Sequence, residues 1–85
     1  MGSIWRGASV TATRFAGLQL AGCDFTGVKG SHADFTGSDL KGAIFTKASL
    51  PDSTFNKAFA EGADFAGAFM EGADFEEARA AGIMM

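Results

Sequence analysis

The chain of 85 residues contains nine Phe, twelve Gly, one Cys and one His, and its formal net charge is −3 at pH 7. A chain this short forms one domain, at a size where a globular core is normally marginal. It holds no apolar run near the roughly 20 residues that cross a bilayer, which excludes a membrane-spanning protein. With one Cys and one His, neither a zinc site nor a Ser-His or Cys-His relay can be assembled, so we expect no enzymatic activity, no metal and no cofactor.

The first four residues are interpreted as an N-terminal leader, followed by a single repeat domain over residues 5–85. Residues 1–6 lack a basic region followed by an apolar stretch, and Arg6 stands where the myristoylation pattern requires Ser or Thr. We therefore expect a cytoplasmic protein with no membrane partner.

A five-residue period runs from Trp5 to Met85 without an insertion. With the exception of Gly30, each pentapeptide has an apolar residue at its centre, and most have a small residue two places earlier and Gly two places later. A period of five fits neither a helix nor a flat strand and predicts a coil whose sides recur. Gly at this spacing predicts corners, because Gly accepts the positive φ of tight turns. Cys23 occupies a small position and is interpreted as a buried apolar residue.

Segments 33–37, 63–67 and 73–77 read A-D-F-x-x. This pattern resembles that of the pentapeptide-repeat family, A-[DN]-[LF]-x-x, and the resemblance covers residues 5–85 in one register. It implies an all-β fold, a right-handed quadrilateral parallel β-helix that forms a solenoid of about four coils, each made of four pentapeptides. The large residue and its small companion are then expected to point inward.

Sorting the central residues by a twenty-residue coil places two aromatic ladders opposite each other. The expected core ladder comprises Phe15, Phe25, Phe35, Phe45, Phe55, Phe65, Phe75, Leu20, Leu40 and Leu50. Gly30 removes a core side chain, and Ala60 and Ala80 thin one side. The alternation every ten residues is what a filled narrow interior needs, but it leaves open whether one turn has two sides or four.

Several outward positions carry residues that need an explanation. Phe59 and Phe69 are large and apolar at nominally outward positions, where they either fold over a thin side or form an exposed patch for a partner. His32 falls at an outward corner and is expected to be solvent-exposed. The Asp residues that precede large residues lack a calcium-binding pattern and are expected to make local hydrogen bonds at turns.

Charge is distributed unevenly along the chain. Residues 61–85 carry six acidic side chains and one basic one, whereas residues 1–60 carry six basic and four acidic ones. This asymmetry either orients a partner or keeps the C-terminal end solvated. The basic residues are scattered and lack an interleaved aromatic surface, which disfavours direct binding of nucleic acid.

Two classes of function remain, and the first is a non-catalytic structural or protein–protein interaction module with an unknown protein partner. The second follows from the resemblance, which implies that some members, the quinolone-resistance proteins, mimic duplex DNA and bind DNA gyrase or topoisomerase IV. A duplex carries one negative charge per about 1.7 Å, so a mimic of roughly 20 Å requires about ten negative charges. The net charge of −3 favours the module. An engineered or truncated repeat segment is a third interpretation.

The ends of a β-helix expose unpaired backbone groups and a section through the apolar core. Ile4 and Trp5 are placed to plug the N-terminal end, whereas Ile83, Met84 and Met85 follow the acidic coil without a recognisable cap. We therefore expect a homodimer joined end to end through the C-terminal coil by a closed two-fold contact.

Overall fold

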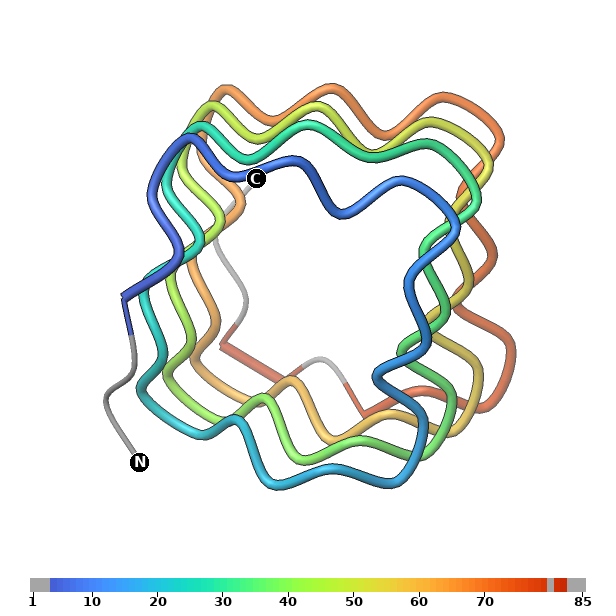
Figure 1. Ribbon diagram of the computed structural model, residues 1–85. Coiled ribbons are helices and arrows are strands. Elements are labelled where there is room, and N and C mark those ends of the chain that lie inside the picture. Colours follow the sequence, from blue (N-terminus) through green and yellow to red (C-terminus); the bar gives the residue numbers. More distant parts are fainter. Residues whose placement is uncertain (1–3, 80, 83–85) are drawn as a thin grey trace.

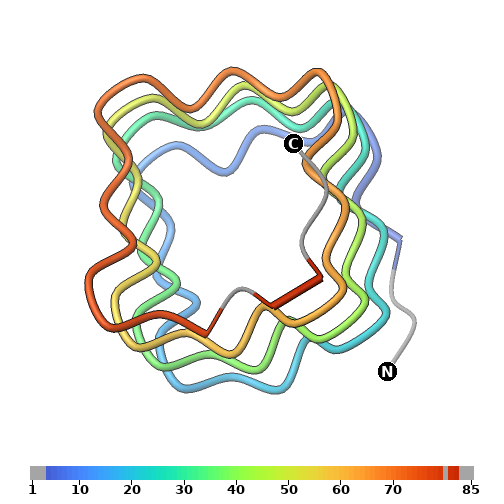
Figure 2. The same ribbon diagram turned by 180° about the vertical axis from the view of Figure 1, so that it is seen from behind.

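The computed structural model describes residues 4–79 and 81–82, which wind into a coil of square outline (Figure 1). In Figure 1 the N-terminal coil lies nearest the viewer and the chain turns clockwise as it recedes, so the coil is right-handed; Figure 2 shows it from behind. The described residues contain no helix and no continuous strand, because their pairing consists of single-residue parallel β-bridges. The fold is an all-β solenoid.

Every β-bridge joins residues twenty positions apart, so four pentapeptides complete one turn. The alternative of two sides per turn is therefore excluded. The bridge residues form four outward columns, one per side: Ile4, Asp24, Ile44 and Asp64 on the first side; Ser9, Lys29, Ser49 and Phe69 on the second; Arg14, Asp34, Thr54 and Asp74 on the third; Gln19, Asp39, Phe59 and Arg79 on the fourth. Because side chains alternate along an extended segment, the residues flanking each bridge residue point inward.

Adjacent coils are hydrogen-bonded in both directions through these outward residues. The Phe35 N–H donates to the Thr54 carbonyl at 2.7 Å, and the Thr54 N–H donates back to the Ala33 carbonyl at 2.9 Å. The same exchange recurs on the other sides of the central coils. It satisfies the backbone of the sides without any strand longer than one paired residue.

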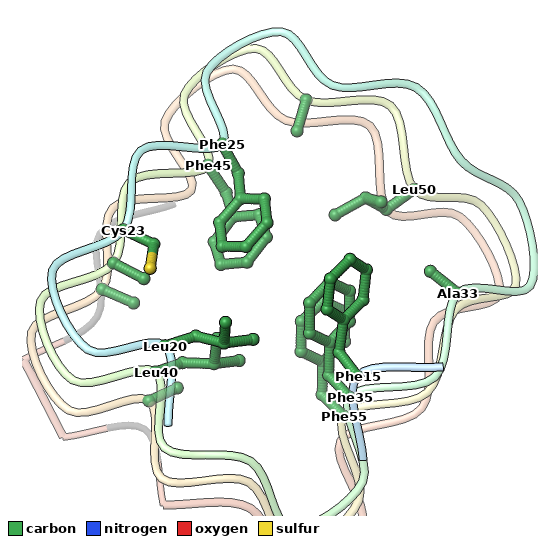
Figure 3. Packing of buried hydrophobic residues seen from close by; sticks show 14 of the residues in the cluster. Phe15, Leu20, Cys23, Phe25, Ala33, Phe35, Leu40, Phe45, Leu50 and Phe55 are labelled. Carbon is green, nitrogen blue, oxygen red and sulfur yellow. The ribbon is translucent and has the colours of Figure 1, made fainter. Parts of the chain in front are cut away.

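Two stacks of aromatic rings fill the interior from opposite sides (Figure 3). In one stack Phe25 lies 4.8 Å from Phe45, and in the other Phe35 lies 4.9 Å from Phe55, with nearly parallel rings. Rings of different stacks meet edge to face, as Phe35 and Phe45 do at 5.6 Å and 90°. Both arrangements are favourable for aromatic quadrupoles, and they fix the position of each coil on the next.

The remaining two sides contribute smaller residues to the same core. Leu20, Leu40 and Leu50 are buried beside the ring stacks (Figure 3). Phe15 is buried in the first coil, whereas Phe75, which stacks on Phe55, is only half-buried. The core is therefore densest in the middle coils.

The sequence suggested that Gly30 removes a core side chain. In the structure, however, no gap remains at this position. A Cβ atom on Gly30 would lie 2.5 Å from Val10 Cγ2 and 2.8 Å from the Val10 carbonyl carbon. The backbone of Gly30 has closed onto the coil before it, so the position has no room for a side chain.

This local approach is accompanied by a different hydrogen-bond pattern in the turn. At most corners the N–H of the small residue donates to the carbonyl three positions earlier, as from Ala43 to Leu40 at 3.0 Å. Between Gly30 and Ala33 the Ser53 hydroxyl is inserted instead: it donates to the Gly30 carbonyl at 3.2 Å and accepts from the Ala33 N–H at 3.1 Å. Ser53 is fully buried, so its hydroxyl is an integral part of that turn.

In the first coil, two residues that stand two places before a central apolar residue do not point inward as expected. Thr13 and Leu18 are exposed, whereas their counterparts one coil later, Ala33 and Ser38, are buried. The later residues lie between two coils, but no described residue covers the N-terminal side of the first coil. Burial at this position therefore depends on a coil on each side.

The corner residues have left-handed backbone conformations. Ten corners carry Gly with positive φ, and six carry other residues: Ala12, His32, Lys47, Asp52, Lys57 and Glu77. The five-residue Gly signal therefore located corners correctly, although the same turn also forms where the sequence has no Gly.

We expect Phe35→Ala to lower the free energy of unfolding by about 3–5 kcal/mol, because the ring is fully buried and stacked on both neighbouring coils. His32→Ala, at an exposed corner, should change it by less than about 0.5 kcal/mol. Urea denaturation monitored by circular dichroism measures both. Equal losses in the two variants would contradict the inward register.

We expect Ser53→Ala to destabilise the protein by about 1–3 kcal/mol, because it leaves both the Ala33 N–H and the Gly30 carbonyl without their hydroxyl partner. Ser38→Ala is the matched control: Ser38 is equally buried, but its hydroxyl donates to the Phe35 carbonyl, which also accepts from the Ser38 N–H. Its loss should be smaller in the same urea titration. A larger loss for Ser38→Ala would show that the inserted hydroxyl is not needed.

Candidate functional site

Catalytic or metal-binding groups do not converge anywhere in the described part of the chain. His32 is exposed at a corner with a φ of 62°, and the Cys23 thiol is buried in the core. Among residues 4–79 and 81–82 no three His, Cys, Asp or Glu side chains are placed to hold a metal ion together. No helix in this part has the length and hydropathy of a membrane span. The candidate site is therefore sought on the outward faces.

The outward Asp residues organise the corners that follow them. Asp24 Oδ1 accepts hydrogen bonds from the Thr26 hydroxyl at 2.6 Å and the Thr26 N–H at 3.0 Å, and Asp34 is bound in the same way by Thr36. Asp39, Asp64 and Asp74 also accept from the backbone N–H two residues on. This is the local turn chemistry that short acidic side chains favour.

Asp24 has the most perturbed carboxyl group among them. The Thr26 hydroxyl and N–H, followed by the Arg6 guanidinium, lower the pKa of Asp24 from 3.8 to about 2. Arg6 Nε donates to Asp24 Oδ2 at 2.6 Å, and the Asp24 side chain is only 12% exposed. The pKa of Asp34 is lowered as well, mainly by the Thr36 hydroxyl. Because Oδ1 of each carboxylate is bound by the Thr two residues on, the two carboxylates stabilise the corners that follow them.

Large apolar side chains are exposed on several sides. Phe59 on the fourth side is 38% exposed and Phe69 on the second side is 52% exposed. The second and fourth sides are opposite each other, so the two rings do not form one patch. Neither ring is buried, which favours exposed rings over rings folded onto a thin side of the core. Ile4 and Ile44 are exposed on the first side.

A concave feature lies on the fourth side, beside Phe59. It is an open depression of about 270 Å³. Its lining comprises Gly17, Leu18, Gln19, Gly37, Asp39, Lys41 and Phe59. The Arg79 guanidinium lies 5.5 Å from the centre of the Phe59 ring, in the next coil. Leu18, 46% exposed, forms the other apolar wall.

Sequence inspection singled out Phe59 but missed this depression. A signal was present, because Leu18 interrupts the series of small residues at its position in the repeat. The sequence could not show that the Leu18 side chain is exposed. Nor could it show that Leu18 lies two coils before Phe59, next to the corner that carries Gly17 and Gly37.

Of the remaining predicted interface residues, Ile83, Met84 and Met85 lie outside the described residues. The acidic residues just before them are placed on the surface: Glu71, Asp74, Glu76 and Glu77 are exposed. None of these four forms an ion pair within the described part of the chain.

We expect Thr26→Val to raise the pKa of Asp24 from about 2 toward 3.8, because the largest stabiliser of the carboxylate is removed. Since the folded-state pKa is depressed, the stability that Asp24 contributes is present above its unfolded pKa of about 3.9 and is lost as the pH falls from about 4 to about 2. Carboxyl ¹³C chemical shifts recorded against pH measure the change. Thr36→Val is the control and should move Asp34 but not Asp24.

Known proteins of similar sequence and structure were then compared with this chain. The family model for pentapeptide repeats matches eight copies within residues 31–59 and 43–79, which together span more than half of the chain. No curated protein sequence matches. The structure is similar to that of QnrB1, a plasmid-mediated fluoroquinolone resistance protein, with a TM-score of 0.75 and 22% identity over 96% of this chain and 55% of QnrB1.

A second similar structure is a pentapeptide-repeat protein from the thylakoid lumen of Arabidopsis thaliana, with a TM-score of 0.57 and 24% identity over 91% of this chain and 57% of that protein. This chain thus spans little more than half the length of either. At these identities the likeness concerns the fold. The family match confirms the resemblance that the repeats suggested, and the chain belongs to the pentapeptide-repeat family.

Proposed function

We propose that this protein is a non-catalytic protein–protein interaction module, a rigid repeat rod of about four coils with largely polar outer sides. One observation carries the proposal: the central rings from Phe25 to Phe65 are entirely committed to the core, while Phe59 and Phe69 remain exposed at outward positions. The extents of the protein along its principal axes are 24 × 24 × 22 Å.

The rigidity of the rod supports this function. Stacked rings and coil-to-coil hydrogen bonds hold the outward columns in a fixed lattice. A binding surface that is ordered before contact loses little conformational entropy when it binds.

A second candidate is mimicry of DNA toward gyrase or topoisomerase IV, and the structural likeness to QnrB1 favours it. Charge counts against it. A DNA duplex 22 Å long, the shortest extent of this protein, carries about 13 negative charges, whereas the net charge of this protein is −3. The exposed acidic residues also concentrate in one coil instead of following the whole axis.

The end-to-end homodimer remains a proposal of its own. It is supported by Met70 and Phe75, which are only half-buried in the C-terminal coil of the described residues. A contact that covers them would be apolar. The acidic side chains of the same coil oppose it, since two copies would bring like charges together.

The interaction module predicts that one side of the square carries the binding. Variants that change two outward residues on a single side, such as Phe59→Ser with Lys41→Gln, or Phe69→Ser with Lys29→Gln, should unfold at the same temperature as the wild type. Each variant is then used to capture partners from the native cell, and the captured proteins are quantified by mass spectrometry. We expect one partner to be lost with the variant of one side and retained with the variants of the other sides. Equal capture by all the variants would contradict the proposal, and inhibition of gyrase supercoiling at low micromolar concentration would favour the DNA mimic.

The dimer predicts that the wild type sediments as two chains at about 100 µM, independently of salt, because apolar contacts are not screened. Ile83→Lys combined with Met84→Lys should give a monomer. Phe69→Ser, on a side of the rod, is the control and should remain dimeric. A monomeric wild type would remove this proposal.

A further inference from the structure

The depression beside Phe59 is formed by two missing side chains. Gly17 and Gly37 occupy successive positions of one corner, and a Cβ atom on either would meet nothing within 4 Å. The next residue of that corner is Lys57, so the bare stretch is limited to the first two coils. Leu18 and Phe59 stand as apolar walls around this backbone floor.

Three backbone donors at the depression are already used. The N–H groups of Gly17 and Gly37 donate to the next coil at 2.9 Å each, and the Asp39 N–H donates to the Leu18 carbonyl at 2.9 Å. Asp39 Oδ1 accepts from the Lys41 N–H at 3.2 Å. These backbone groups are not available to an occupant, so we consider apolar contact and side-chain charge.

The size of the depression limits the occupant. Pockets for drug-sized ligands and cofactors span about 300–1,000 Å³, and this one of about 270 Å³ is smaller and open. It has room for one large apolar side chain that rests against Leu18 and Phe59. A protein segment brings such a side chain together with its own flanking groups.

The charges at the rim decide what those flanking groups are. Lys41 and Arg79 are exposed and form no ion pair among the described residues, and the Arg79 guanidinium lies beside the Phe59 ring. Two carboxylates lie nearby. Asp39 accepts from the Lys41 N–H and keeps its charge, and Glu61 lies in the same corner as Lys41, one coil later, without an ion pair to either cation among the described residues. Two free cations beside an apolar pocket complement carboxylates.

We propose that the fourth side binds a partner segment in which one apolar side chain, of the size of Leu or Phe, is flanked by carboxylates. The apolar side chain fills the depression between Leu18 and Phe59, and the carboxylates face Lys41 and Arg79. This inference rests on the proposed interaction module and names its binding side and the chemistry of its partner.

The test is a ¹H–¹⁵N NMR titration of the full chain with three short acetylated peptide amides: Asp-Phe-Glu, Lys-Phe-Lys and Asp-Ala-Glu. The first should shift the amide signals of Gly17, Gly37 and Lys41 at the lowest concentration. The other two should bind at least about tenfold more weakly, because one reverses the charges and the other lacks the anchor.

Matched variants locate the contact. Phe59→Ser should weaken binding of Asp-Phe-Glu by at least about tenfold, and Lys41→Gln by about two- to fivefold, as for one exposed ion pair. Phe69→Ser and Lys47→Gln, which alter an aromatic ring and a lysine elsewhere on the rod, should leave it unchanged. Thermal unfolding of each variant at the wild-type temperature shows that the core is intact.

Equal binding of the acidic and basic peptides, or shifts confined to the second side, would overturn this inference. If the acidic peptide fails to bind while side-specific capture of a cellular partner succeeds through another side, the interaction module stands and only this assignment falls. If the fourth-side variant no longer captures the cellular partner and the acidic peptide binds as expected, the results support both the interaction module and the binding side assigned to it.

Discussion

The spacing of the stacked phenyl rings is the constraint on which the rest of the molecule depends. Rings of one stack lie 4.8–4.9 Å apart in the middle coils, and this is also the distance between hydrogen-bonded β-segments. Since the two distances agree, the core and the backbone ladder favour the same rise per turn. The edge-to-face contacts between the two stacks then fix the orientation of each side relative to the others. As a result, the outward residues lie at regular positions on the surface.

The acidic residues illustrate how much surface chemistry is used for folding. Asp24 and Asp34 direct their carboxylates back to Thr26 and Thr36, and the lowered pKa of each reflects those hydrogen bonds. Carboxylates used in this way are poor candidates for ligand binding. Ser53 is also used for folding, because its hydroxyl takes the place of the hydrogen bond between the Ala33 N–H and the Gly30 carbonyl, where Gly30 approaches Val10.

What remains for function lies at outward positions that neither the core nor the corners use. On the fourth side an exposed ring and a bare corner meet at a depression that Lys41 also lines, and Arg79 lies over the ring; neither cation forms an ion pair within residues 4–79 and 81–82. The side opposite carries Phe69, which is 52% exposed. A square rod therefore presents four chemically different sides, and a partner can distinguish them by the residues of each column. At 22% identity the likeness to QnrB1 concerns the fold and says nothing about these columns.

The five-residue period by itself located the corners through its Gly residues, whereas the inward register of Phe25, Phe45 and Phe65 followed from the resemblance to the pentapeptide-repeat family. It also located Phe59 at an outward position. Only the tertiary structure decided that four pentapeptides form one turn, since ladders on opposite sides are compatible with two sides or four until the bridges fix twenty residues per turn. It likewise decided the approach of Gly30 to Val10 and the depression between Leu18 and Phe59, because both arise from contacts between coils, and residues twenty or more positions apart have no local signal in the sequence.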